Sequence, residues 1–115
     1  MKVEVTKSFS FDAAHQLPWH PGKCRNLHGH TYRLDVTVTG PINETGIVID
    51  FDEISSVVKA AVLKKYDHQY LNDHFPNPTA ELVALEFAKI LEAEGLSVER
   101  LTLWETPTSS ATVGR

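Results

Sequence analysis

The sequence contains one cysteine, Cys24, and no apolar run that approaches the length of a membrane span. A single thiol excludes an internal disulfide, so we expect the fold to depend on its hydrophobic core. A transmembrane helix needs about 20 consecutive apolar residues, and residues 1–5 alternate apolar with polar side chains, unlike a secretory signal. These absences predict no membrane partner and a location in the cytoplasm.

Basic residues are fewer than acidic ones: the chain has 11 lysines and arginines and 15 aspartates and glutamates, which gives a net charge of −4. Proteins that bind nucleic acids usually carry a basic surface, so we expect no nucleic-acid partner. The chain has 115 residues, of which 42% are hydrophobic and 23% are charged. This length and composition predict a single domain over residues 1–115.

Two segments, residues 3–11 and 31–39, alternate apolar with polar side chains. A period of two is typical of a strand with one buried face. Proline and glycine interrupt the connection between the two segments, which predicts a loop. Residues 98–104 and 109–114 are interpreted as two closing strands.

Helical periodicity follows two candidate N-terminal caps, Asp50 and Thr79, and Gly95 fits the C-terminal end of the second helix. The order of elements is therefore ββααββ. Because strands and helices do not alternate, we expect an α+β fold with an antiparallel four-stranded sheet and two helices on one face. Such a sheet leaves two open edges, and pairing of edges between copies is one remedy.

Three of the six histidines form a pattern typical of a metal site. His28 and His30 are two residues apart, so on a strand they would project from one face with about 7 Å between their backbones. His15 follows the alternation of the first strand and would meet them if the two strands pair. Three imidazoles with one open position describe a catalytic zinc site. The alternative is that His28 and His30 are ordinary polar loop residues. His20 and His74 are interpreted as surface residues.

Cys24 lies between Lys23 and Arg25, four residues before His28. Flanking cations and a nearby metal favour the thiolate, which is the reactive form. The thiolate could act as a base or as a nucleophile. Two alternatives stay open, a small buried apolar side chain and a fourth ligand that closes a structural zinc site.

Two carboxylates complete the candidate residues. Asp67 precedes His68, and a carboxylate can orient an imidazole, although adjacent side chains meet only in a turn. The alternative is that His68 lies at the negative end of a helix dipole. Glu105 shares the alternation of Leu101 and Leu103, so it is placed to point inward. A buried carboxylate needs donors, such as the guanidine-like edge of a ligand, and the alternative is an exposed strand-end glutamate.

Six short motifs follow one another along the chain. They are Phe11–His15, Cys24–His30, Val48–Phe51, Asp67–Asn72, Asn77–Glu81 and Trp104–Thr106. In this order they resemble the 6-pyruvoyltetrahydropterin synthase superfamily over essentially the whole chain. The short Cys-x-x-x-His-Gly-His spacing is similar to the 6-carboxytetrahydropterin synthase branch, which belongs to queuosine (7-deazapurine) biosynthesis.

The resemblance implies a T-fold (tunnelling fold), in which three ββααββ units form a β-barrel and two trimers stack as a homohexamer. It also implies active sites at subunit interfaces, where His68, with Asp67, serves a zinc ion held by the neighbouring subunit. The implied zinc ligands are His15, His28 and His30. The implied proton-transfer residues are Cys24 as general base, the pair Asp67 and His68, and Glu105. The implied substrate contacts are Glu105 on the amino-pyrimidine edge of the pterin, Thr106 and Phe51.

The implied reaction is that of a zinc-dependent lyase. It converts 7,8-dihydroneopterin triphosphate into 6-carboxy-5,6,7,8-tetrahydropterin and releases acetaldehyde and triphosphate. Some of the basic residues are expected near the triphosphate, among Lys2, Lys7, Lys23, Arg25 and Arg33. Two alternatives share the motifs, a 6-pyruvoyltetrahydropterin synthase that eliminates triphosphate and an aldolase that acts on dihydroneopterin. A non-enzymatic alternative is an oligomeric binding module with a structural zinc ion.

Overall fold

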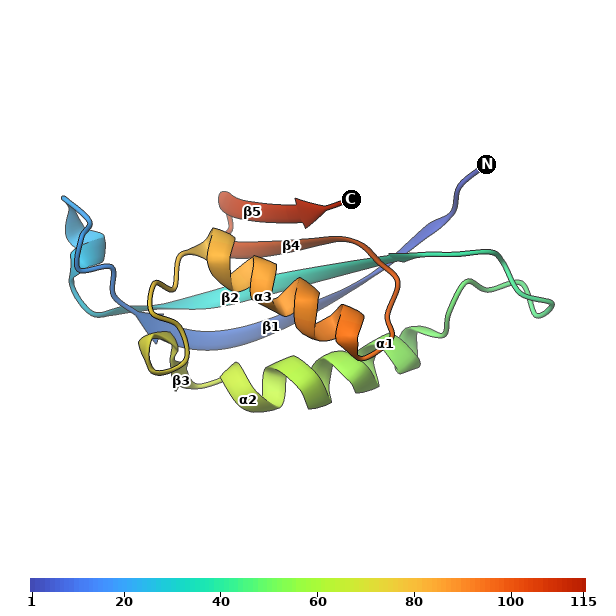
Figure 1. Ribbon diagram of the computed structural model, residues 1–115, viewed down its shortest axis with the longest axis horizontal. Helices are drawn as coiled ribbons and strands as arrows, with labels where there is room; N and C mark the ends of the chain where they lie inside the picture. Colours follow the sequence, from blue (N-terminus) through green and yellow to red (C-terminus); the bar gives the residue numbers. More distant parts are fainter.

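The computed structural model describes all residues from 1 to 115 as a long, twisted sheet with helices against one face (Figure 1). Five strands have the order β3-β1-β2-β4-β5. The strands are β1 (Glu4–His15), β2 (His28–Thr39), β3 (Gln69–Tyr70), β4 (Val98–Thr106) and β5 (Ser109–Gly114). The helices are α1 (Phe51–Val58), α2 (Lys64–Tyr66) and α3 (Ala80–Ala93), with short turns at η1 (Lys23–Arg25), η2 (Lys59–Leu63) and η3 (Leu71–Asp73).

Strands β1 and β2 form the longest pair in the molecule. They run antiparallel from Glu4 opposite Thr39 to His15 opposite His28. Both strands extend further toward their connecting loop than the predicted segments, which were residues 3–11 and 31–39. The extension is important for the site because β1 ends on one histidine and β2 begins on another.

The prediction of a four-stranded, fully antiparallel sheet is wrong at one edge. The additional strand β3 pairs parallel with β1, with Ala13 opposite Gln69 and Ala14 opposite Tyr70. A strand of two residues is too short to show a period of two in the sequence. The other pairs, β1 with β2, β2 with β4 and β4 with β5, are antiparallel as predicted.

The first helical segment is continuous, and a π-helical turn, η2, joins α1 to α2. Asp50 caps its start, because the Asp50 side chain accepts a hydrogen bond from the backbone N–H of Asp52 at 2.8 Å. A side-chain oxygen at this position satisfies one of the free N–H groups at a helix start. The cap predicted at Asp50 is confirmed.

The second long helix, α3, also begins and ends as predicted. The Thr79 hydroxyl accepts from the backbone N–H of Leu82 at 3.2 Å. Gly95 follows the helix with φ of +95°, a left-handed conformation that glycine adopts without strain. Its N–H donates to the carbonyl of Glu92 at 2.9 Å, which is part of a Schellman-type ending.

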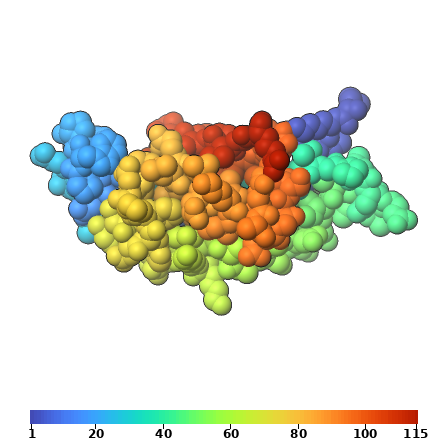
Figure 2. Space-filling view, in the orientation of Figure 1, coloured from blue at the N-terminus to red at the C-terminus, as the bar shows by residue number.

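The two faces of the sheet differ in chemistry. A cluster of 22 buried apolar residues lies between the helices and the inner face, while the outer face carries hydroxyl and charged side chains, such as the hydrogen-bonded pair Thr6 and Thr37. No helix is long and apolar enough to cross a bilayer. The loop between β1 and β2 projects at one end of the molecule, and residues 40–48 project at the other (Figure 2).

Candidate active site

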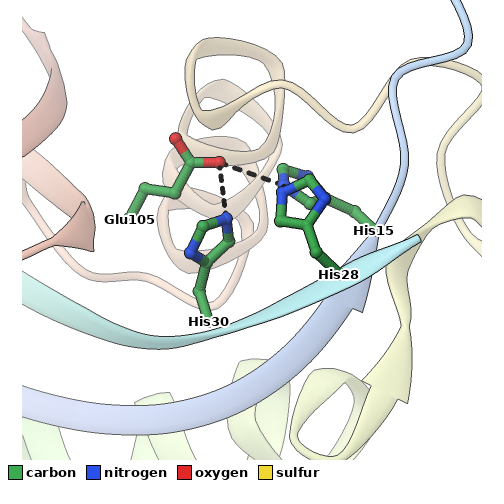
Figure 3. Close-up of side chains that lie close together, drawn as sticks. All are labelled: His15, His28, His30 and Glu105. Carbon is green, nitrogen blue, oxygen red and sulfur yellow. Dashed lines mark hydrogen bonds and ion pairs between the residues drawn. The ribbon is translucent and has the colours of Figure 1, made fainter. Parts of the chain in front are cut away.

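Three histidines converge at the end of the β1–β2 pair (Figure 3). The pairing places His15 directly opposite His28 and places Ala13 opposite His30, so all three rings project from the inner face. The Nε2 atoms of His15 and His28 are 3.0 Å apart. Atoms of His15, His28, His30 and Glu105 that could bind a metal all lie within 4.8 Å of one another.

Hydrogen bonds from the backbone orient two of these rings. Nδ1 of the buried His15 lies 2.9 Å from the carbonyl oxygen of Pro78, and Nδ1 of His28 lies 2.8 Å from the carbonyl oxygen of Asn26. A carbonyl acceptor favours a proton on Nδ1, so in the neutral ring the lone pair lies on Nε2. The two Nε2 atoms are therefore directed at the centre of the cluster, where Nε2 of His15 faces Glu105 Oε1 and donates to it when the ring is protonated.

Glu105 reaches the same centre from β4. Its Oε1 atom lies 3.0 Å from His15 Nε2 and 3.2 Å from His30 Nε2 (Figure 3). The inward orientation that its alternation with Leu101 and Leu103 predicted is confirmed, since both leucines are buried. Sequence reasoning did not foresee that the carboxylate would lie between the histidine rings.

Mutual contact shifts the pKa values of these groups. Hydrogen bonding from His15 holds the pKa of Glu105 below its ordinary value, although burial opposes the shift. Burial would lower the pKa of His15, but hydrogen bonds to Glu105 and Pro78 outweigh it and raise that pKa. Burial lowers the pKa of His30, which keeps its ring neutral. Neutral imidazoles are the form that binds metals.

The cluster fits a zinc ion on one specific observation. His30 Nε2 is buried and has no hydrogen-bond partner, although Glu105 Oε1 lies 3.2 Å away. Buried polar atoms almost always have a hydrogen-bond partner, so the unpartnered nitrogen of His30 is an exception that indicates a missing ligand. A metal ion bound by three imidazoles would supply it, in the donor set typical of catalytic zinc.

Cys24 does not belong to the cluster. It lies in the short turn η1 of the loop between β1 and β2, where its thiol is free and partly exposed. Its carbonyl accepts from the backbone N–H of Leu17 at 2.8 Å, which folds the loop back on itself. The alternative in which Cys24 closes a structural zinc site is not supported by this arrangement, because the fourth group near the histidines is Glu105.

Asp67 and His68 form a contact of their own just beyond α2. Asp67 Oδ1 lies 2.9 Å from His68 Nδ1. Adjacent side chains meet here because His68 has φ of +61°, in the left-handed region. This conformation is costly for a residue with a side chain, and it supplies the turn that the sequence reasoning required.

A hollow of about 540 Å³ lies beside His68. His30 and His68 both contribute to its wall, together with Asp12, Gly29 and Thr31. Of the inner-face cluster only His30 borders this hollow, because most of the strand residues that line it, such as Asp12 and Thr31, alternate with the inward-facing residues.

The two remaining predicted contacts lie elsewhere in the chain. Thr106 lines a separate hollow of about 260 Å³ with Thr31, Arg33 and Trp104. Phe51 is exposed and is the first residue of α1, which begins near the end of the molecule opposite the β1–β2 loop (Figure 1). Within a single chain, Phe51 therefore does not meet the histidine cluster.

An inward cluster of three histidines beside an open hollow is typical of a metalloenzyme. The 6-pyruvoyl tetrahydropterin synthase family matches this chain over residues 4–115, and the chain belongs to that family. The structure of a Caenorhabditis elegans 6-pyruvoyl tetrahydropterin synthase superposes with a TM-score of 0.87 at 25% identity, covering 100% of this chain and 96% of that one.

Curated relatives point to one branch more than to others. A 6-carboxy-5,6,7,8-tetrahydropterin synthase of Synechocystis is 44% identical over 93% of this chain and 89% of the relative. A dihydroneopterin monophosphate aldolase of Pyrococcus furiosus is 38% identical over 91% of each. The prediction that the chain is an enzyme similar to the 6-carboxytetrahydropterin synthases is confirmed.

Two residues near the site were given no role by sequence reasoning. The carbonyl of Pro78 orients His15, and the side chain of Asn72 contacts the backbone next to His15. Both residues lie within the motifs that carry the family resemblance, which is the only signal the sequence offered for them.

Proposed function

We propose that this chain is a zinc-dependent lyase of queuosine (7-deazapurine) biosynthesis. It takes up water and converts 7,8-dihydroneopterin triphosphate into 6-carboxy-5,6,7,8-tetrahydropterin, acetaldehyde and triphosphate. The observation that carries the proposal is the convergence of three imidazoles, one with an unpartnered buried nitrogen, in a chain 44% identical to a named 6-carboxytetrahydropterin synthase.

His15, His28 and His30 would hold the zinc ion. When bound, the ion would lower the cost of negative charge on the hydroxyl groups of the substrate side chain. The histidines lie on the paired strands β1 and β2, and Glu105 lies on β4, so the site is formed before the substrate enters. Preorganised geometry of this kind avoids reorganisation during the reaction.

Glu105 would anchor the pterin. A carboxylate offers two acceptors to the amino group and ring N–H of the pterin edge, a pairing that can be bidentate. Glu105 Oε2 has no partner among the residues described above, and the carboxylate borders a hollow of about 350 Å³ at the β4–β5 turn. Thr106 and Phe51 would add further contacts, with Phe51 supplied by a neighbouring copy.

Cys24 and the pair Asp67–His68 would move protons. The partly exposed thiol of Cys24, which follows Lys23 and precedes Arg25 in the chain, would remove a side-chain proton. His68 would accept or deliver the next proton, and Asp67 would hold its Nδ1 through the 2.9 Å contact.

Product analysis tests this proposal directly. Purified protein loaded with zinc is incubated with 7,8-dihydroneopterin triphosphate, and the products are identified by mass spectrometry. We expect 6-carboxytetrahydropterin and acetaldehyde. A pterin that keeps all three side-chain carbons after loss of triphosphate would identify a 6-pyruvoyltetrahydropterin synthase instead.

An aldolase is the second candidate, because a relative at 38% identity is named dihydroneopterin monophosphate aldolase. Such an enzyme would cleave the side chain while leaving the carbon next to the ring as a hydroxymethyl group. Parallel incubation with the monophosphate and the triphosphate distinguishes the two activities.

The non-enzymatic alternative is tested at the thiol. If Cys24 were a zinc ligand, bound zinc would protect its thiol from alkylation. Removal of the zinc with a chelator would then make the thiol reactive. A catalytic Cys24 should alkylate while zinc stays bound.

A homohexamer of two stacked trimers would complete the site. Two features favour pairing between copies. One is the open sheet edges, which are β5 and the part of β1 that the two-residue strand β3 leaves unpaired. The other is the exposed apolar residues at the far end of the molecule, among them Ile42, Ile47 and Phe51. Light scattering of the purified protein measures the assembly. The cytoplasmic location stays a prediction.

A further inference from the structure

The segment that follows α2 runs beside the end of β1 and contacts it at successive residues. Asp67 Oδ1 accepts from the backbone N–H of Asp12 at 3.0 Å, and the backbone N–H of His68 donates to the carbonyl of Asp12 at 2.6 Å. Strand β3 then pairs with residues 13 and 14 of β1. The contact thus leads from the Asp67–His68 pair toward the buried end of the strand.

The side chain of Asn72 continues this contact one step beyond the strand. Its Oδ1 atom accepts from the backbone N–H of Gln16 at 3.0 Å, and its Nδ2 atom donates to the carbonyl of Gln16 at 2.8 Å. The amide offers one acceptor and one donor, so it pairs with Gln16 as a backbone residue of a neighbouring strand would. Both residues are partly buried.

This pair lies directly after a metal-binding side chain. The β1–β2 pairing ends at His15 opposite His28, so Gln16 has no partner residue in β2. The ring of His15 is held at Nδ1 by Pro78, from the same connection that carries Asn72. Residues 72–78 therefore fix His15 twice, once at the ring and once at the following peptide.

We propose that Asn72 is a positioning residue of the metal centre. By pairing with the backbone of Gln16 it holds the end of β1 in place, so that His15 Nε2 meets the other two imidazoles. The role rests on the zinc site proposed above. Groups that orient metal ligands typically change metal affinity by about 10- to 100-fold when removed, and we expect Asn72 to lie near the lower end because it acts through the backbone.

Zinc affinity of two variants tests this role without any measurement of turnover. Asn72→Leu keeps the branched shape but loses both hydrogen bonds, and Asn72→Ala loses the shape as well. Asn43→Ala is the matched control, because Asn43 Oδ1 also accepts from backbone N–H groups, those of Thr45 and Ile47, but in the loop at the far end of the molecule. Affinity is measured by competition with a chromogenic chelator, and Co²⁺ absorption spectra report the ligand geometry.

We expect both Asn72 variants to fold without metal, to bind zinc roughly tenfold more weakly than wild type and to show an altered Co²⁺ spectrum, while Asn43→Ala matches wild type. Wild-type affinity in Asn72→Leu would overturn the role, since packing alone would then suffice. If neither variant folds by circular dichroism, Asn72 serves folding and the positioning role is wrong. A wild-type protein that binds no zinc would overturn the zinc site itself, a result distinct from these.

Discussion

Glu105 and Asp35 are carboxylates on opposite faces of one sheet, and their surroundings differ sharply. Asp35 accepts three hydrogen bonds, from Ser8 at 2.6 Å, Arg33 at 2.9 Å and Trp104 at 3.1 Å. Glu105 approaches His15 and His30 through one oxygen only. Their side chains are similarly exposed, 16% for Asp35 and 26% for Glu105, so exposure does not account for the difference.

The two faces differ in whether their polar atoms already have hydrogen-bond partners. On the outer face, burial would raise the pKa of Asp35, but the three donors outweigh it and hold the pKa below its ordinary value. On the inner face, His30 Nε2 has no hydrogen-bond partner. A fully satisfied charge stabilises the fold, whereas a converging and incomplete set of donors is poised for a ligand. Changes on the two faces should therefore separate stability from function.

The largest effect is expected at the metal ligands. His28→Ala and His30→Ala should each remove most of the bound zinc, because two imidazoles hold the ion far less tightly than three. Metal analysis of the purified variants measures this. His20→Ala and His74→Ala, at histidines outside the cluster, should retain zinc, and stoichiometric zinc in the first two variants would show that the ligands are wrong.

The next effect is expected at His68, which lies outside the metal cluster. His68→Ala should lower turnover by about 10²- to 10⁴-fold, the usual contribution of a general acid or base, with zinc content unchanged. Steady-state kinetics and metal analysis check both parts. A variant within a few-fold of wild type would leave His68 as a residue of the turn after α2.

Mixing this variant with a Cys24→Ala variant sharpens the test. If the two residues serve one site from different subunits, mixed assemblies should recover part of the activity. No recovery would place both residues of a site in one chain.

Glu105→Gln tests the inner carboxylate itself. Glutamine replaces one acceptor with a donor, which sets donor against donor at the pterin edge and costs about 1–3 kcal/mol. Pterin affinity should fall by roughly one to two orders of magnitude, with zinc retained by the three histidines. Calorimetry with a pterin that lacks phosphate isolates this contact. Loss of zinc would instead make Glu105 a fourth metal ligand.

Asp35→Asn should show the smallest effect, and on stability alone. The amide leaves at least one of the three donors unmatched, so we expect a loss of about 1–3 kcal/mol of unfolding free energy at neutral pH. Because the pKa of Asp35 is lowered in the folded state, its stabilisation is present above the ordinary aspartate pKa and is lost as the pH falls through the lowered value. Denaturant titrations should show the two proteins converging in acid, with zinc content equal throughout.

The sequence predicted the elements that repeat a period and missed those that do not. Alternation put His15 in phase with β1 and His28 and His30 in phase with each other, and the pairing of β1 with β2, which the sequence reasoning assumed, brings the three onto one face. The strand β3 has two residues and no period, so nothing local marked it. Asn72 and Gln16 are 56 positions apart, and a side chain that pairs with a distant backbone leaves no pattern in either segment.

The sequence predicted which residues belong to the candidate site, but it predicted only part of how they are grouped in space. The position of Glu105 between His15 and His30 depends on how far β4 extends beside β2, which alternation alone does not fix. The contact between Asp67 and His68 depends on the left-handed backbone at His68, a conformation that histidine adopts only when the surrounding structure holds it.

The π-helical turn η2 determines how the helical segment responds to the deletion of a residue. Ile54, Val58, Val62 and Tyr66 are each four residues apart, and all four are buried. A regular α-helix turns about 100° per residue, so three steps of four residues would drift about 120° away from the sheet. The wider turn absorbs a residue and brings the apolar side chains back into line. With one residue deleted, a regular helix over the remaining 11 steps would turn about 1100°, within about 20° of three full turns, so the Asp67–His68 turn would keep its direction. A single deletion should therefore be tolerated in this segment, whereas a deletion in a regular stretch of helix would rotate everything beyond it by about 100°.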